Sequence, residues 1–497
     1  MGSRSPEGSR SPVGGRASGG SWLREPWLRI VLGSVLLGGC SLAPRMHEPE
    51  ITAGDAYKEL GPWSPAQPAD RLPRDTWWAV YDNPEIDALA VRLIAGNPSL
   101  AAALANYAQA TALRDQVRAG LFPTVGLNAG VARARESAHA PLTGPTTPRY
   151  YDDDVLGGSA SYEFDLWGQI RNQVASGQAS AEAASADLEN ARLSLLAQLV
   201  DDYVQLRSLD REGAILTGTV DAYDHAVQLT EQRHGAGIGS GLDVAQAQTQ
   251  LSTARSDAAQ VLAQRALVEH AIAALLGVSA STFSIEPAIV DVKLPQVPVG
   301  VPTTLLERRP DIAAAQRRMI AANANIGVAK AAYFPSLTLG AQGGFQSTSF
   351  SNWLSAPSSF WAIGPNALLT VFDGGLRRAQ VAQARAQFDA ASADYRGVAV
   401  AAFQQVEDSL ASLHHYDDAA REEKAAVAAA QRTLDLSMAL YKQGATDYLT
   451  VVTSQTALLQ AQVQALSLET LQLRASVDLV RALGGGWMDD GRRLASR

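Results

Sequence analysis

The sequence predicts a mostly α-helical fold with a membrane β-barrel portion, and three observations support this fold class. The chain repeats itself once along its length. Each half contains an uninterrupted helix that is too long for a compact globular domain, and each half also contains strand-like segments of membrane-spanning length. Together they predict duplicated long-helix coiled-coil hairpins and four β-strands per chain.

The internal duplication is visible when the chain is aligned with itself. Residues 97–127 align without gaps with residues 309–339, at an offset of 212. Further along the offset becomes 207, where Asp210 pairs with Asp417 and Gly237 pairs with Gly444. Both halves should therefore have the same order of elements: a short helix, two strands, a very long helix, a tight turn and a second helix.

The lengths of the helices predict the wall of a cylinder. Residues 171–234 form a stretch of about 64 residues without proline, which gives a helix of about 95 Å at 1.5 Å per residue. Residues 97–121 and 241–277 are predicted to form helices of 25 and 37 residues. Stacked end to end, these two helices would match the long one.

Both long helices carry the pattern of a coiled-coil seam, because apolar residues recur at alternating spacings of three and four. The seam residues are Leu196, Leu199, Tyr203 and Leu206 in the first half and Phe403, Val406, Leu410 and Leu413 in the second.

The tips of the hairpins are predicted to be sharp reversals. Gly237 and Gly444 follow the long helices at positions where a left-handed residue ends a helix. Ser240 and Asp447 stand as N-caps of the next helices, and Asp243 is predicted to complete a capping box with Ser240.

Between the short and the long helix of each half, apolar and polar residues alternate. The alternating stretches are residues 125–131, 160–166 and 336–346, and residues 360–372 form a less regular fourth stretch. An open sheet in lipid would leave its edge amides unsatisfied, and four strands are fewer than the smallest usual barrel contains. The barrel must therefore be shared between chains. A soluble four-stranded sheet is the alternative that alternation by itself leaves open.

The first forty residues are typical of an export signal. Arginines precede the short apolar run of residues 30–37, which is too short to span a bilayer. The run ends in Leu37-Gly38-Gly39-Cys40, which resembles the bacterial lipobox. Cys40, the only cysteine, is therefore the predicted lipidation site, and a buried structural cysteine is the alternative.

These features predict the following division of the chain. Residues 1–39 are a signal peptide, in which residues 1–20 have the composition of a mis-called start; residues 40–96 are a lipidated N-terminal linker; residues 97–277 are the first repeat; residues 278–308 link the repeats; residues 309–484 are the second repeat; and residues 485–497 are a C-terminal tail.

Composition and motifs argue against several function classes. The net charge of −9 is spread over both signs along the chain, so no basic stripe is present to hold nucleic acid. The histidines contain no HExxH or paired metal spacing, and the adjacent His414 and His415 are expected on a solvated helix face. No phosphate-binding glycine loop follows a strand. We therefore expect no catalytic site, no cofactor and no metal site.

Four sequence motifs carry a family resemblance. They are SYEFDLWG at residues 161–168, ERRPDI at 307–312, YFPSL at 333–337 and ALGGGW at 482–487. With the duplication, they resemble the TolC-like outer-membrane factors of tripartite efflux pumps, in the NodT-type lipoprotein branch. The resemblance implies a homotrimer with a 12-stranded barrel and an α-helical periplasmic tunnel. It also implies a lipid-anchored outer-membrane channel that exports small toxic compounds or drugs, partnered by a periplasmic adaptor (membrane fusion) protein and an RND-type inner-membrane transporter.

The same resemblance implies that the hairpin tips lie near a closed aperture or an adaptor contact. The candidate residues are Arg233, Gly237, Ser240, Leu242, Asp243, Tyr441, Gly444, Asp447, Tyr448 and Leu449. Members of the family commonly place acids where this chain has Thr450 and Thr453. A ring of carboxylates would then come from Asp243 or Asp447, and the alternative is that both residues only cap helices.

Two other functions remain as alternatives. One is a type I protein-secretion duct, and the other is a structural coiled-coil lipoprotein that conducts nothing. The duplicated strand pairs argue against the second alternative, because a scaffold does not need them.

Overall fold

The computed structural model describes residues 41–295 and 308–485, apart from residues 52–53, 55–56, 60–75, 138, 140–145 and 147. Cys40 and the predicted signal peptide lie outside the described residues. The chain divides into two compact units. The sheet unit contains Pro123–Gln169 and Phe334–Thr370, and the helical unit contains Ala43–Phe122, Ile170–Tyr333 and the chain from Val371 onward.

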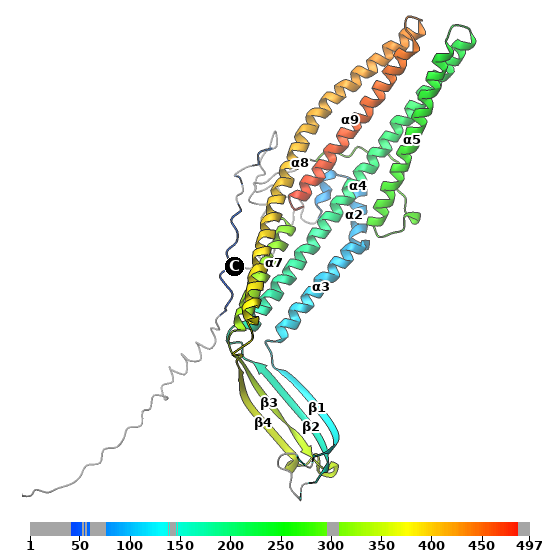
Figure 1. Cartoon of the computed structure of the whole chain (residues 1–497). Coiled ribbons are helices and arrows are strands. Elements are labelled where there is room, and N and C mark those ends of the chain that lie inside the picture. Colours follow the sequence, from blue (N-terminus) through cyan, green and yellow to red (C-terminus); the bar gives the residue numbers. More distant parts are fainter. Residues whose placement is uncertain are drawn as a thin grey trace, which may run out of the picture. The chain divides into compact units, whose positions relative to one another are not determined.

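The helical unit consists of two long hairpins and shorter helices beside them (Figure 1). Its elements in chain order are η1 (Trp77–Tyr81), α2 (Pro84–Gly96), α3 (Pro98–Ala119), α4 (Gln169–Gly235), α5 (Gly241–Leu275), η2 (Ala280–Thr282), α7 (Pro310–Ala331), α8 (Leu376–Lys442) and α9 (Tyr448–Ala482). The short, long and returning helices contain 22, 67 and 35 residues in the first half, and the same three numbers recur in the second. This equality confirms the predicted duplication.

The short helix and the returning helix meet end to end in each half, as predicted. Asn97 caps α3 by accepting the N–H of Leu100 at 2.8 Å, and its side-chain amide donates to the carbonyl of Leu275 at 2.8 Å. In the second half, the guanidinium of Arg309 donates to the carbonyl of Ala482 at 2.9 Å. One side chain therefore joins the end of α5 to the start of α3, and another joins the end of α9 to the start of α7.

The predicted seam forms the main hydrophobic core of the helical unit. Seven of its eight residues are buried, and Phe403 packs against them partly buried. The core also takes in the aromatic residues of η1 and one face of α2, including Trp77, Tyr81 and Leu93. Burying apolar side chains along both long helices fixes the two hairpins to the short elements between them.

The sheet unit contains one antiparallel sheet with the strand order β1-β2-β3-β4 (Figure 1). The strands are β1 (Thr124–Arg135), β2 (Tyr150–Glu163), β3 (Ser336–Ser347) and β4 (Ser359–Leu368), and the short turns η4 (Phe350–Asn352) and η5 (Ala356–Ser358) connect the last two. The register places Val125 opposite Ala160, Ala160 opposite Ala341 and Ala341 opposite Ile363.

The predicted bounds of three strands are wrong. β1 extends to Arg135, four residues beyond the predicted stretch. β2 begins at Tyr150 and ends at Glu163, so Phe164 and Leu166 lie beyond it. The acidic run of residues 152–154 interrupts the alternation and hides the first part of this strand. β4 ends at Leu368, four residues earlier than predicted.

The two faces of the sheet differ in chemistry. One face carries rows of apolar residues that no described residue of the unit covers: Val125, Leu127, Val131, Trp361 and Ile363 are between 63% and 89% exposed. The opposite face carries mainly glycine, serine, threonine and side-chain amides. This division is typical of a membrane β-barrel, which presents an apolar band to lipid and a polar interior to water.

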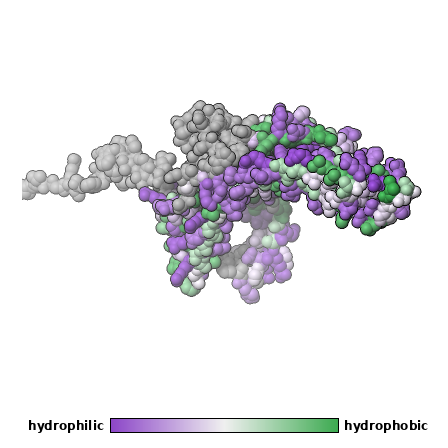
Figure 2. Space-filling model, turned by 90° about the horizontal axis from the view of Figure 1, so that it is seen from above, coloured by the Kyte–Doolittle hydropathy of each residue, from purple (hydrophilic) through white to green (hydrophobic). Residues whose placement is uncertain are grey.

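Among the described residues, no single helix is long and apolar enough to cross a membrane, and the bent pair α2 and α3 meets that test by length and composition only. Hydrophilic residues predominate on the face shown in Figure 2, where hydrophobic residues are scattered in small groups.

Candidate functional site

Both hairpin tips end their long helix with the same backbone motif. In the first tip, Gly237 has a φ of 74°, its N–H bonds to the carbonyl of His234, and the N–H of Ile238 bonds to the carbonyl of Arg233, both at 3.0 Å. In the second tip, Gly444 also has a φ of 74°, and its N–H bonds to the carbonyl of Tyr441 at 3.0 Å. The paired bonds satisfy the last carbonyls of each helix and require a left-handed residue. The tips are therefore the sharp reversals that the sequence predicts.

The returning helices are capped as predicted, but the capping box is not formed. Asp447 accepts the N–H of Thr450 at 3.0 Å and its hydroxyl at 2.7 Å. Ser240 accepts the N–H of Leu242 at 3.0 Å, one residue before the position that a capping box uses. No bond from the N–H of Ser240 to Asp243 occurs among the described residues. The prediction of a capping box is wrong because the Ser240 hydroxyl takes the earlier donor.

A cluster of aromatic residues joins the two hairpins just inside their tips. Tyr441 of α8 and Tyr448 of α9 are 3% and 1% exposed, and their ring centroids lie 5.3 Å apart. The guanidinium of Arg233 in α4 lies 4.8 Å from the centroid of the Tyr441 ring. Tyr223 of α4 and Leu251 of α5 belong to the same buried cluster. We call these contacts the tip cluster, and they hold α4 and α5 against α8 and α9.

The tip cluster buries polar atoms. The hydroxyls of Tyr441 and Tyr448 and the Nε of Arg233 have no hydrogen-bond partner among the residues that the structure describes. Burial raises the pKa of Tyr448 to about 12, and the nearby charge of Asp243 adds to the shift. Burial and Asp243 also raise the pKa of Tyr441. Unpaired buried polar groups destabilise a packed contact, so the contact between the hairpins is less stable than an apolar one of the same size.

The ten candidate residues fall into two groups. The tyrosines of the tip cluster are buried and Arg233 is half-buried, whereas Leu242 and Leu449 are 64% and 52% exposed at the tips. The carboxylate of Asp447 is also exposed, and its hydrogen bonds with Thr450 lower its pKa. Ile238 is not among the residues predicted from the sequence, and it is 68% exposed between Gly237 and Gly239 of the first tip. Its position could have been predicted, because an apolar residue inside a tight turn is usually exposed.

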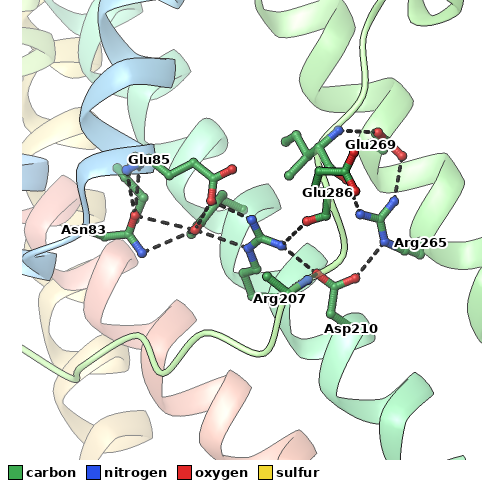
Figure 3. A network of polar contacts seen from close by, with 11 residues as sticks. Asn83, Glu85, Arg207, Asp210, Arg265, Glu269 and Glu286 are labelled. Carbon is green, nitrogen blue, oxygen red and sulfur yellow. Dashed lines mark hydrogen bonds and ion pairs between the residues drawn. The ribbon is translucent and has the colours of Figure 1, made fainter. Parts of the chain in front are cut away.

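A second polar site was not predicted, and it lies halfway along the first hairpin (Figure 3). Arg207 of α4 donates to Glu85 of α2 at 2.5 Å and to Asp210 at 2.7 Å. Asp210 also accepts from Arg265 of α5 at 2.7 Å, and Arg265 bonds to Glu269 at 2.7 Å. We call this chain of ion pairs the mid-hairpin network.

The mid-hairpin network holds the segment that follows α5. The carbonyl of Glu286 accepts from Arg207 at 2.9 Å, and the N–H of Ile285 donates to Glu269 at 2.6 Å. The N–H of Ala288 donates to Asp210 at 3.2 Å. The side chains of Arg207 and Asp210 are only 4% and 2% exposed, so each buried charge is paired on more than one side. The network therefore fixes α2, α4, α5 and the start of the inter-repeat segment as one body.

In the part of the second half that the structure describes, this network is absent, although the helices have the same lengths. At the offset of 207, His414 and Gln472 stand where the first half has Arg207 and Arg265. Gln472 retains a weak contact of 3.5 Å with Asp417, the counterpart of Asp210. The side-chain atoms that His414, His415 and Asp418 could offer to a metal ion lie within 4.8 Å of one another, and His415 and Asp418 are exposed.

Comparison with known proteins agrees with this architecture. The family model described as "Outer membrane efflux protein" matches residues 89–278 and 301–485. The pyoverdine export outer membrane protein OpmQ of Pseudomonas aeruginosa is 31% identical over 474 residues, which cover 95% of this chain and 99% of OpmQ. The antibiotic efflux pump outer membrane protein ArpC of Pseudomonas putida is 30% identical, over 93% of this chain and 96% of ArpC.

A solved structure supports the same assignment. The outer-membrane channel OprN matches with a TM-score of 0.83 and 30% identity, over 90% of this chain and all of that one. Its family comprises outer-membrane efflux channels rather than enzymes. The duplicated hairpins, the two-faced sheet and these matches show that the chain belongs to the outer membrane efflux protein family, as an outer-membrane channel with a helical tunnel and a β-barrel.

Proposed function

We propose that three copies of the chain form a passive conduit that exports small toxic compounds or drugs, working with a periplasmic adaptor and an RND-type inner-membrane transporter. The observation that carries the homotrimer is the sheet of four strands, which has an uncovered apolar face and two open edges, β1 and β4. Open edges are not stable in lipid, and joining β4 of one copy to β1 of the next closes the sheet. Three copies supply twelve strands, enough to enclose a passage.

The class of exported compound is supported by the relatives. OpmQ is named for pyoverdine export and ArpC for antibiotic efflux. The proposed channel catalyses no reaction, so the energy for export comes from the transporter, and the chain contributes a path and a gate.

The hairpin tips supply the contact for the adaptor. Ile238 and Leu242 at the first tip and Leu449 at the second are more than half exposed. Apolar side chains exposed on rigid turns are typical of a docking surface. The capped reversals hold these side chains in place, which reduces the entropy lost on binding.

The tip cluster is the proposed gate. It ties the two hairpins of one chain together through Tyr441 and Tyr448, and its unpaired polar atoms make that contact easy to separate. An adaptor that binds the tips could pull the hairpins apart without breaking an apolar core of the same size.

Removing the gate should leave the channel open. Tyr441→Ala together with Tyr448→Ala deletes both rings of the tip cluster, so we expect a several-fold rise in ion conductance of purified trimers in a planar bilayer. Leu449→Ala is the matched control, because Leu449 is exposed and belongs to no buried cluster among the described residues. Equal conductance of the double variant and the wild type would show that the tip cluster does not close the channel.

The export function is tested by deleting the gene in its host. With the partner transporter expressed, we expect a several-fold fall in the inhibitory concentration of amphiphilic toxins and recovery when the gene is restored. Unchanged inhibitory concentrations for all the toxins tested would exclude the drug-efflux role.

Cys40 is the proposed lipid attachment site, because it follows a lipobox-like segment. The lipid would help to target and seat the protein, while the barrel holds it in the membrane. Cys40→Ala exported by an ordinary signal peptide is therefore expected to form trimers in the outer-membrane fraction. Complete loss of membrane association in this variant would contradict a barrel that anchors itself.

A further inference from the structure

The polar face of the sheet carries one large aromatic side chain in its central rows. This face points into the barrel, because its serines, glutamines and asparagines cannot face lipid. The register places Phe360 of β4 in one row with Gly344, Gly157 and Asn128. The neighbouring Trp361 points to the apolar face, where it is 80% exposed.

Because Gly157 and Gly344 have no side chains, the Phe360 ring can lie flat against the backbone of the neighbouring strands. The Cζ of Phe360 lies 3.5 Å from the position that a Cβ on Gly157 would occupy, and the Oδ1 of Asn128 lies 3.1 Å from the same position. The phenyl ring therefore lies across the backbone of β2 beside an amide oxygen. Phe360 is half-buried, so part of the ring stays exposed toward the interior. A partly exposed ring face attracts aromatic rings and cations.

The charges on the same face have one sign. Asp153 and Glu163 lie an even number of residues from Gly157 in β2, so they are on the same face of the sheet as Gly157. The four strands place no lysine or arginine on this face. Asp153 lies toward the loop end and accepts a hydrogen bond from Gln346 at 2.9 Å. An acidic interior favours cations and disfavours anions.

Resting on the proposed conduit, we propose that Phe360 and Asn128 form a contact site for aromatic organic cations on the inner wall of the barrel, repeated in each copy. The ring supplies a face for stacking, the amide oxygen of Asn128 supplies a partial negative charge, and Asp153 supplies the full charge that concentrates cations nearby. Aromatic cations therefore stay longer in this passage than equally charged aliphatic ones.

The experiment measures the block of ion current through wild-type trimers in a planar bilayer. The probes are benzyltrimethylammonium, cyclohexylmethyltrimethylammonium and tetramethylammonium, which carry the same charge. We expect the benzyl cation to halve the current at about a fivefold lower concentration than either aliphatic cation, from the usual strength of stacking between two aromatic rings. Equal block by the benzyl and cyclohexylmethyl cations would overturn the proposal without any variant.

Matched variants locate the site. Phe360→Leu should remove the preference, whereas Phe360→Tyr and the control Trp361→Leu should keep it. Asp153→Asn should weaken the block by all three cations to the same extent. A preference that survives Phe360→Leu, or disappears in Trp361→Leu, would overturn the assignment to Phe360. Current without any preference would overturn this site alone. A trimer that carries no current even when Tyr441→Ala and Tyr448→Ala have removed the tip cluster would overturn both the site and the proposed conduit.

Discussion

Ala341→Arg is expected to abolish the assembled channel, whereas Gln342→Arg at the next position is expected to leave it intact. Ala341 is near the middle of β3, on the apolar face between Ala160 and Ile363. An arginine at this depth on a lipid-facing surface destabilises a barrel by about 2–4 kcal/mol, and the proposed trimer contains the substitution three times. Gln342 lies on the opposite face, where a charged side chain stays in water.

The measurement is the fraction of protein that runs as a heat-labile trimer after extraction from the outer membrane. We expect the trimer band to disappear for Ala341→Arg and to remain above half of the wild-type amount for Gln342→Arg. Both variants add the same side chain to adjacent residues of one strand, so general effects on expression should be shared. Equal amounts of trimer in the two variants would show that the apolar face does not contact lipid.

Much of this fold could be predicted from periodic sequence patterns that occur in both halves of the chain. The seam through Leu199 and Tyr203 recurs at Val406 and Leu410, and all four side chains are buried. The tip glycines were predictable for a similar reason, because a long helical pattern that stops at glycine leaves few ways to reverse the chain. The first part of β2 was not predictable, because Asp152, Asp153 and Asp154 break the alternation and their pairing partners lie in other strands.

The candidate site was predicted only in part. The family resemblance implies that Tyr441 and Tyr448 lie near an aperture or an adaptor contact, which stays a prediction, and the structure adds that both are buried between the hairpins. Burial between two helices that are far apart in sequence cannot be read from local spacing. Ser240 shows the same limit at short range, since two neighbouring N–H groups compete for one hydroxyl.

The mid-hairpin network escaped prediction because its members form no motif. Arg207 and Glu85 are 122 positions apart, and Arg265 lies on a third helix. The sequence did contain one usable signal, which was a difference between the two halves at equivalent positions. Arg207 and Arg265 are replaced by His414 and Gln472 in the second half, although Asp210 is retained as Asp417. A charge present in only one copy of a repeat indicates a contact that only that copy makes, here with the inter-repeat segment.

Arg207→Met is expected to be the most destabilising single substitution in the helical unit. It removes a buried guanidinium that bonds Glu85, Asp210 and the carbonyl of Glu286. Removing one partner of a buried ion pair typically lowers the free energy of unfolding by about 3–5 kcal/mol. We expect the lower end of this range here, because Asp210 keeps Arg265 at 2.7 Å and the Glu85 side chain is 39% exposed. The inter-repeat segment should also loosen, since it is held there by backbone bonds to Arg207, Asp210 and Glu269.

The test compares denaturant-induced unfolding of purified trimers carrying Arg207→Met or His414→Met. These residues occupy equivalent positions in the two halves. The His414 side chain is 38% exposed, lies 3.9 Å from Asp418 and has its ring centroid 5.1 Å from that of His415, so its replacement should change stability by less than about 0.5 kcal/mol. Adding Glu85→Gln to Arg207→Met should destabilise by less than the sum of the single changes, because the carboxylate has already lost the guanidinium and keeps only the Tyr203 hydroxyl at 2.7 Å. Equal effects at Arg207 and His414 would mean that the long helices alone stabilise this region. The observed asymmetry of the repeats would then need another cause, since the network is what joins the first hairpin to the connection between the halves.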